Sequence, residues 1–179
     1  MKFLFHCLMT AMLLLLSPAA KAEVIATFYS HDLDDHFPHA LIVVKGTVDS
    51  SGEVVDTNYG FTAVNVSPAI LWGSVKGKIE TQPVKYVDHS DPHFSIRLTE
   101  EQYGQLLALI EEWRNLPGKS YNLNKRNCVH FVLEAAALLG LEVNRESKLM
   151  KKPKSFLLEV MKLNPELGLT TDPEPSLTN

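Results

Sequence analysis

Cysteine is scarce in this sequence, which has only Cys7 and Cys128 among its 179 residues. Cys7 lies within the first 22 residues, which have the composition of a leader, so one cysteine remains once the leader is removed. A single cysteine excludes an internal disulfide, and in an oxidising compartment a lone thiol is either buried or reactive. The sequence also lacks internal repeats and a separate wall-binding module, so peptidoglycan is not specifically indicated as a substrate.

Long apolar runs are missing as well. The run from Leu4 to Leu16 is mainly apolar but shorter than the roughly 20 residues of a transmembrane helix. Lys2 precedes it, and Ala20-Lys21-Ala22 follows it with the small residues of a cleavage site. Residues 1–22 are therefore predicted to be a signal peptide, with a periplasmic or secreted mature protein that fits a bacterial envelope. An uncleaved membrane anchor is the alternative.

An excess of basic residues is also absent. The chain has 17 basic and 21 acidic residues, a net charge of −4. Removal of the leader takes away Lys2 and Lys21, which leaves 15 basic residues against 21 acidic ones, a net charge of −6. This balance argues against nucleic acid or an anionic membrane surface as the main partner. Contact with a membrane is expected only transiently, during export.

The order of the expected elements favours an α+β domain over residues 23–163, followed by a disordered tail over 164–179. Strands are expected first and helices later, with the helices packed on one face of an antiparallel sheet. The expected strands cover 24–29, 39–47, 53–61, 77–87 and 93–98, with a turn at 49–52. A short helical turn is expected after Pro68, with Leu71 and Trp72 packed. Longer helices are expected at 99–115, 128–139 and 153–163, the first with a Thr99–Gln102 capping box.

Cys128 is the candidate nucleophile. It follows Asn127, a good helix N-cap, so it occupies the first helical position. The partial positive charge at a helix N-terminus favours thiolate, the reactive form of cysteine. A structural interpretation stays open, because Cys128, Val132, Ala135 and Leu139 are also spaced as one buried helical stripe.

His39 is the candidate base, since a histidine pKa lies near neutrality. It opens an apolar strand, where an exposed strand-end histidine is the alternative interpretation. If the hairpin turns around residues 50–51, paired positions sum to about 101 and His39 lies opposite Thr62. Asn58 then shares the face of His39 and is the first choice to orient the imidazole, with Asp56 second.

These residues carry a resemblance to a known superfamily. The motif Asn127-Cys128-Val129-His130-Phe131, following a strand that starts at His39, resembles the circularly permuted papain-like enzymes. These include the permuted NlpC/P60 hydrolases and the lecithin:retinol acyltransferase group, whose Asn-Cys-Glu-His-Phe motif has Glu where this chain has Val129. The resemblance implies a small antiparallel sheet or partial barrel with the nucleophile helix packed against it.

The implied reaction is acyl transfer from an amide or ester of a wall peptide, lipid or protein, through a thioester on Cys128. The backbone N–H of Cys128 is expected to hold the oxyanion, with Asn127 and Tyr121 as oxyanion or support residues. For Tyr121 the alternative is a packed loop tyrosine. His130 is expected to point away from the thiol and to be structural. No cofactor is expected.

Two other functions stay open. One is a metal site, because imidazole and carboxylate groups are concentrated in two stretches that could bind zinc: His31, Asp32, Asp34, Asp35 and His36, and Asp88, His89, Asp91 and His93. The other is a secreted binding or accessory domain that keeps the fold without the chemistry.

Overall fold

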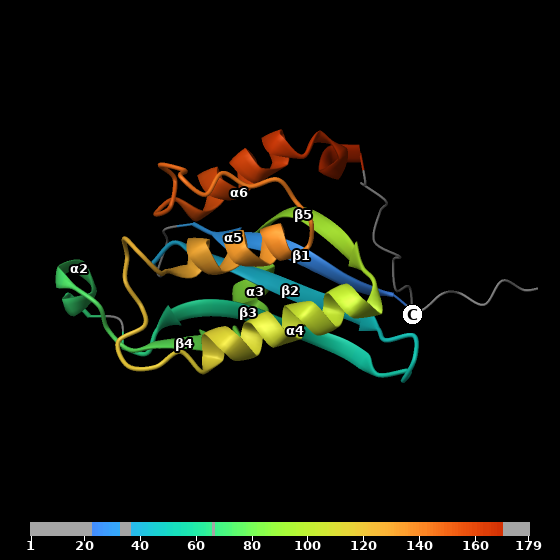
Figure 1. Cartoon of the computed structure of the whole chain (residues 1–179), viewed down its shortest axis with the longest axis horizontal. Coiled ribbons are helices and arrows are strands. Elements are labelled where there is room, and N and C mark those ends of the chain that lie inside the picture. Colours follow the sequence, from blue (N-terminus) through green and yellow to red (C-terminus); the bar gives the residue numbers. More distant parts are fainter. Residues whose placement is uncertain (1–22, 33–36, 66, 170–179) are drawn as a thin grey trace, which may run out of the picture.

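The computed structural model describes residues 23–32, 37–65 and 67–169, and has the α+β architecture expected from the sequence (Figure 1). The strands are β1 (Val24–His31), β2 (His39–Thr47), β3 (Val54–Ala63), β4 (Gly77–Glu80) and β5 (Asp91–Leu98). The helices are α2 (Ala69–Trp72), α3 (Val84–Asp88), α4 (Glu100–Arg114), α5 (Cys128–Leu138) and α6 (Pro153–Leu163), with a 3-10 helix η2 (Pro165–Leu169). The predicted leader, residues 1–22, lies outside the described residues.

The five strands form one antiparallel sheet in the order β4-β3-β2-β1-β5. Ile42 pairs with Tyr59 and Val43 with Asn58, so paired positions of β2 and β3 sum to 101 and the predicted register is confirmed. The turn at 49–52 sets this register, and Gly52 adopts the left-handed φ of 70° that glycine tolerates best.

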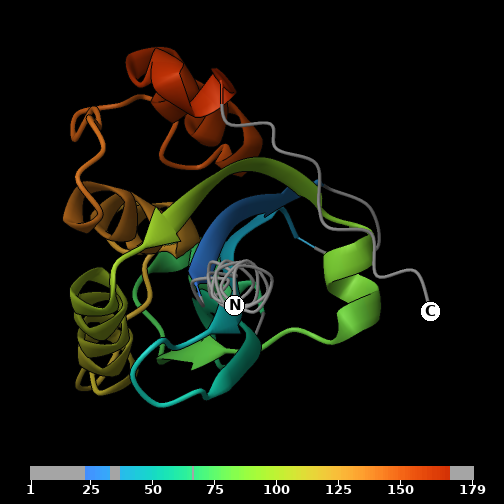
Figure 2. The ribbon, with the colours of Figure 1, turned by 90° about the vertical axis from the view of Figure 1, so that its right-hand side faces the viewer.

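The two faces of the sheet have different roles. Ala40, Ile42 and Val44 of β2 belong to the core cluster formed with α4, α5 and α6. His39, Leu41 and Val43 alternate with them and therefore face the other side. Because β4 and β5 lie at opposite edges, the connection through α3 crosses this second face. Figure 2 shows α3 on the side of the curved sheet opposite to the three long helices.

The helix signals in the sequence are confirmed. Thr99 and Gln102 form the capping box of α4, and Leu106, Ile110 and Trp113 are its buried residues. Helix α5 ends before Gly140, which has a φ of 91°, and α6 begins at Pro153. No helix within the described ranges is long and apolar enough to cross a membrane.

Three expectations from the sequence are wrong. The strand expected over 77–87 ends at Glu80, because Pro83 lacks the N–H needed for a ladder and instead precedes α3. Helix α2 forms after Pro68, but Leu71 and Trp72 are exposed and Ile70 is the buried residue. The tail begins with η2 rather than disorder, and residues 170–179 lie outside the described part of the chain.

Candidate active site

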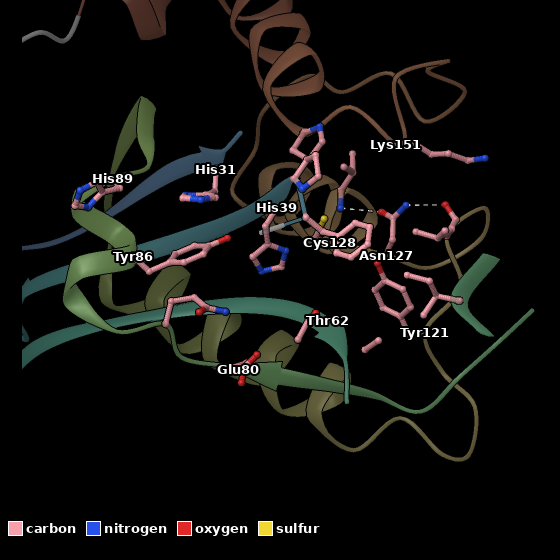
Figure 3. Close-up of a pocket in the computed structure, with 18 of the residues that line it drawn as sticks. His31, His39, Thr62, Glu80, Tyr86, His89, Tyr121, Asn127, Cys128 and Lys151 are labelled. Carbon is pink, nitrogen blue, oxygen red and sulfur yellow. Dashed lines mark hydrogen bonds between the residues drawn. The ribbon is translucent and has the colours of Figure 1, made fainter. Parts of the chain in front are cut away.

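A pocket of about 1100 Å³ opens at one end of the sheet (Figure 3). The first residue of α5, Cys128, and the first residue of β2, His39, both line it. Strand β4 contributes Glu80 and the crossing connection contributes Tyr86. The pocket therefore brings together the predicted nucleophile and base, which are 89 positions apart in the sequence.

Asn127 is the N-cap of α5. Its Oδ1 accepts hydrogen bonds from the backbone N–H groups of Val129 (2.8 Å) and His130 (3.3 Å). The backbone N–H of Asn127 in turn donates to Nδ1 of His130 at 3.3 Å, which completes a capping box. The spacing of Asn127 and His130 is thus explained by local helix capping. Cys128 occupies the first helical position, as expected, and His130 has a structural contact.

Asn127 also links this helix start to two loops. Its Nδ2 donates to the carbonyl oxygens of Leu123 (2.8 Å) and Met150 (2.7 Å). An asparagine amide has two N–H donors, so both are used. Of the two roles expected for Asn127, the geometry fits support of the site and not donation to an oxyanion.

We expect Asn127→Ala to lower the free energy of unfolding by about 2 kcal/mol. The substitution removes the cap of α5 and leaves the carbonyl groups of Leu123 and Met150 without their donor. Urea unfolding followed by circular dichroism would measure the loss. Asn124→Ala, at an exposed position of the same loop, is the control and should change stability by less than about 0.5 kcal/mol. Equal losses in the two variants would contradict the assigned role of Asn127.

Cys128 is buried, with 6% of its surface exposed. Burial raises the pKa of its thiol to about 11, although the backbone N–H groups of Ala40, Val129 and Cys128 itself act in the opposite direction. The helix N-terminus therefore favours thiolate as expected, but desolvation is the larger effect and the thiol is protonated at neutral pH. Cys128 also belongs to the core cluster with the other members of its helical stripe, so it has a packing role as well.

His39 is equally enclosed. It pairs across the sheet with His31, and 8% of its surface is exposed. Burial lowers its pKa to about 4, the nearby Glu80 acts to raise it, and His31 acts to lower it. Its Nε2 atom is buried and has no hydrogen-bond partner within the described chain. A buried nitrogen of this kind is costly, by about 1–3 kcal/mol, and calls for a functional explanation.

Gly60 leaves room for the imidazole of His39. A Cβ atom at position 60 would lie 2.3 Å from Nε2 of His39, inside van der Waals contact. Glycine weakens a strand interior and often marks a place where another group approaches closely, which is the case here. Glu80 pairs with Gly60 across β3 and β4, so its side chain leaves the sheet on the same face.

We expect Gly60→Ala to slow any reaction that depends on His39 by about tenfold or more, because displacing a catalytic group by about 1 Å can cost up to a hundredfold. The new methyl group would move the imidazole, whose ring can rotate, and leave the backbone of β3 in place. The steady-state rate with an acyl donor would show the loss. Gly104→Ala, at a helical position with open space around its Cβ, is the matched control. An unchanged rate in Gly60→Ala would show that the position of the imidazole is unimportant.

The expected third residues are not beside His39. Both amide atoms of Asn58 bind the backbone of Gln82, with Gln82 N donating to Oδ1 at 2.7 Å and Nδ2 donating to Gln82 O at 2.9 Å. Asp56 is exposed and lies 3.7 Å from the ammonium of Lys45. The face was predicted correctly, and the imidazole of His39 lies against Gly60, two residues from Asn58, but the amide of Asn58 is used by the backbone of Gln82. Glu80 is the carboxylate that acts on His39, and it was missed.

Tyr121 is positioned beside Cys128. Its backbone forms two hydrogen bonds with Val75, each 2.9 Å long, and its ring packs 5.7 Å from that of Phe61. Burial and the neighbouring Cys128 raise the pKa of Tyr121, so its hydroxyl stays protonated and can donate a hydrogen bond. Figure 3 shows this hydroxyl pointing towards Asn127 and Cys128. The position fits the support role expected of Tyr121.

The first stretch considered as a metal site runs from His31 to His36, and its two described residues, His31 and Asp32, make contacts with other side chains. His31 lies 3.1 Å from the hydroxyl of Ser90 and stacks on Tyr86 at 4.1 Å between ring centroids. Asp32 accepts a hydrogen bond from Nζ of Lys154 at 2.9 Å. Asp34, Asp35 and His36 lie outside the described residues.

The second stretch is also engaged in other contacts. Asp91 binds Lys154 at 2.7 Å, His93 binds the Ser30 hydroxyl at 2.8 Å, and Nδ1 of His89 lies 2.7 Å from the Lys85 carbonyl oxygen. No group of three or more metal-binding side chains occurs in the part of the chain that the structure describes.

The site thus holds a buried thiol, a buried imidazole and a carboxylate, with a tyrosine hydroxyl nearby. The sequence motif pointed to the thiol and the strand start pointed to the imidazole, whereas no feature of the sequence pointed to the carboxylate. In comparisons of this chain with known proteins, no protein-family model, no curated protein and no solved structure matches it.

Proposed function

We propose that this protein is a cysteine-dependent hydrolase or acyltransferase that acts on an amide or ester through a thioester on Cys128. The observation that carries the proposal is the unpartnered, buried Nε2 of His39 in the pocket that also holds the Cys128 thiol. In the tautomer that carries its proton on Nδ1, Nε2 has a free lone pair and can accept a proton from a thiol in the same pocket.

In the proposed reaction, Nε2 of His39 takes the proton of the Cys128 thiol as the sulfur attacks the substrate carbonyl carbon. The carbonyl π electrons move to the oxygen and form a tetrahedral oxyanion. When the intermediate collapses, the bond to the leaving amine or alcohol breaks, and the leaving group takes the proton from His39. Water, or an acceptor alcohol or amine, then attacks the thioester and releases the thiol, with His39 again transferring the proton.

Two donors can stabilise the oxyanion. The N–H of Cys128 lies in the first turn of α5, where backbone donors have no intrahelical partner. The Tyr121 hydroxyl lines the same pocket and stays protonated. Glu80 is a positioning residue in this scheme, because its charge favours the imidazolium form of His39.

The arrangement of the elements supports a permuted papain-like fold as part of the proposal. In this chain the histidine of β2 precedes the cysteine of α5, as in the permuted branch of that superfamily. Helix α5 packs against β2 and β3, and its first residue reaches the backbone of Ala40, next to His39. The antiparallel sheet with the nucleophile helix against it is the architecture that the resemblance implies.

The test is to trap the acyl group on Cys128. The Cys7→Ser chain, with Cys128 as its single thiol, is incubated with p-nitrophenyl esters of graded length and with dipeptide amides. The proposal expects the mass of the acyl group on the peptide that contains Cys128, no adduct in Cys128→Ala, and slower acylation in His39→Ala. His89→Ala, at an exposed position of the pocket rim, is the control. Acylation that is equally fast without His39 would contradict the proposed base.

A non-catalytic binding domain is the second candidate. The observation in its favour is that burial raises the pKa of Cys128 and lowers that of His39, so both groups are neutral at rest. A thiol that stays unmodified by every acyl donor, in a protein whose Cys128→Ala variant binds the same ligands with unchanged affinity, would support this function and exclude the enzyme.

We also propose that the protein is exported to the periplasm or secreted, on the basis of the leader-like residues 1–22. The intact mass of the protein recovered after expression would test this. The expected mature chain begins at Glu23 and carries a net charge of −6, and Ala22→Leu should block its formation, since the cleavage site needs a small residue. A full-length chain in the membrane fraction would instead indicate the anchor.

A further inference from the structure

The tip of α2 exposes two large apolar side chains. Leu71 is 68% exposed and Trp72 is 88% exposed, whereas Ile70 of the same turn is buried and lines the pocket. Figure 1 shows α2 projecting from one end of the molecule. An exposed leucine beside an almost fully exposed tryptophan is unusual, because tryptophan is highly buried on average. Tryptophan is enriched where an apolar phase meets water, as at a membrane surface.

Acidic residues are nearly absent from three segments, which hold one, three and four basic residues respectively: 67–77, 115–127 and 145–152. Together they hold eight basic residues and one acidic residue, Glu146. Of the 17 basic and 21 acidic residues of the chain, nine and twenty therefore lie elsewhere. The acidic net charge belongs to the rest of the protein, and these segments form a basic collar, which includes Lys125, Arg126, Lys151 and Lys152.

The three segments of the basic collar are joined to one another. Nδ2 of Asn122 donates to Oγ of Ser74 at 3.0 Å, which links the first segment to the second. Nδ2 of Asn127 donates to the carbonyl of Met150 at 2.7 Å, which links the second to the third. All three segments contribute to the pocket lining, the first with Ile70, the second with Tyr121, Leu123 and Asn127, and the third with Lys151. The basic collar therefore borders the pocket on the side where the tip of α2 lies.

We propose that the tip of α2 and the basic collar dock onto an anionic lipid bilayer, with Trp72 and Leu71 in its interface. The combination of exposed aromatic and aliphatic side chains with flanking cations is the one that binds such a surface. Two apolar side chains are too few for the core of a stable protein–protein interface. Docking in this position brings the pocket close to the bilayer. The proposal stands on exposure and charge, independently of the reaction proposed above.

Trp72 itself reports on the docking. The chain has two tryptophans, and Trp113 is 3% exposed and donates to Glu134 at 3.0 Å, so it contributes a constant background. With equimolar phosphatidylglycerol and phosphatidylcholine vesicles, the emission is expected to shift to shorter wavelength and to become protected from acrylamide. Lipids brominated near the headgroup should quench it. The apolar leader can bind vesicles by itself, but such binding leaves Trp72 accessible to acrylamide.

Matched variants separate the two parts of the surface. Lys125→Glu should weaken binding to the anionic vesicles at least about fivefold, since each basic residue near a charged surface contributes about a factor of five and the new carboxylate is repelled by it. Lys162→Glu, an exposed control on α6, should not. Trp72→Ser should lose the fluorescence response, whereas Val54→Ser, at a residue that is 77% exposed, should keep it.

Three outcomes would overturn the proposal. The first is a Trp72 that stays accessible to acrylamide on vesicles that carry the protein. The second is equal affinity of Lys125→Glu and Lys162→Glu. The third is a wavelength shift that appears without vesicles as the protein concentration rises, which would assign the tip of α2 to contact between two copies of the chain.

Discussion

Iodoacetamide is expected to alkylate Cys128 of the folded protein about a hundredfold more slowly at pH 8 than it alkylates an ordinary cysteine. Burial raises the pKa of the thiol from 9.0 to about 11, and the thiolate is the reactive form. At pH 8, which is below both pKa values, this increase of about two in pKa reduces the thiolate fraction about a hundredfold. The measurement is the alkylation rate of the Cys7→Ser chain between pH 7 and pH 11, followed by mass spectrometry, with the unfolded chain in guanidinium as reference.

The dependence of the alkylation rate on pH shows whether Cys128 and His39 are neutral or charged in the absence of substrate. For a neutral pair, the rate rises steadily to about pH 11 and is the same in His39→Ala. A rate that levels off below pH 8.5, and loses this plateau without His39, would mean a thiolate–imidazolium pair and would contradict the effect of burial. Slow alkylation together with fast acylation by an ester would show that proton transfer to His39 accompanies attack on the bound substrate.

Local signals predicted much of this fold. Strand β2 has the predicted bounds, His39–Thr47, because its β-branched run is bounded by a loop and a turn. The register of β2 and β3 followed from the position of that turn. The N-cap Asn127 fixed the first residue of α5, and with it the place of Cys128. In each case the determining contacts lie within a few residues of one another.

Features that depend on contacts between distant parts of the chain could not be predicted from the sequence. The charge of Glu80 acts on His39 because β4 pairs with β3, where Glu80 lies opposite Gly60, and these two residues are 20 positions apart in the sequence. Asn58 has the right face, but Gln82, which binds it, belongs to a connection whose path depends on the strand order. The exposure of Trp72 likewise depends on where α2 lies relative to the core.

Charge distribution changes one conclusion drawn from composition. A net charge of −4 argues against an anionic membrane, but it averages over the whole chain. Contacts such as Asn122 with Ser74 gather basic segments around the tip of α2, and no composition records this. A membrane surface thus becomes a testable partner for this one end of an acidic protein.

His39 is expected to make the protein less stable by about 3 kcal/mol as the pH falls from 6.5 to 4. Burial lowers the pKa of its imidazole from 6.5 to about 4, so over this interval the unfolded chain binds a proton that the folded chain does not. The loss of stability therefore begins near pH 6.5, proceeds at about 1.4 kcal/mol per pH unit and ends near pH 4, below which both states bind the proton. Urea unfolding at pH 7, 6, 5 and 4 would measure it.

The variant His39→Gln isolates this contribution. The pKa values of His93 and His130 are also lowered by burial, so they destabilise the wild type in the same direction and persist in the variant. The stability of the wild type relative to His39→Gln should therefore fall by about 3 kcal/mol between pH 7 and pH 4. A constant difference across this range would mean that the folded protein accepts a proton on His39 as readily as the unfolded chain. The imidazole would then be a stronger base than its burial indicates, and the Cys128–His39 pair could carry charge before a substrate arrives.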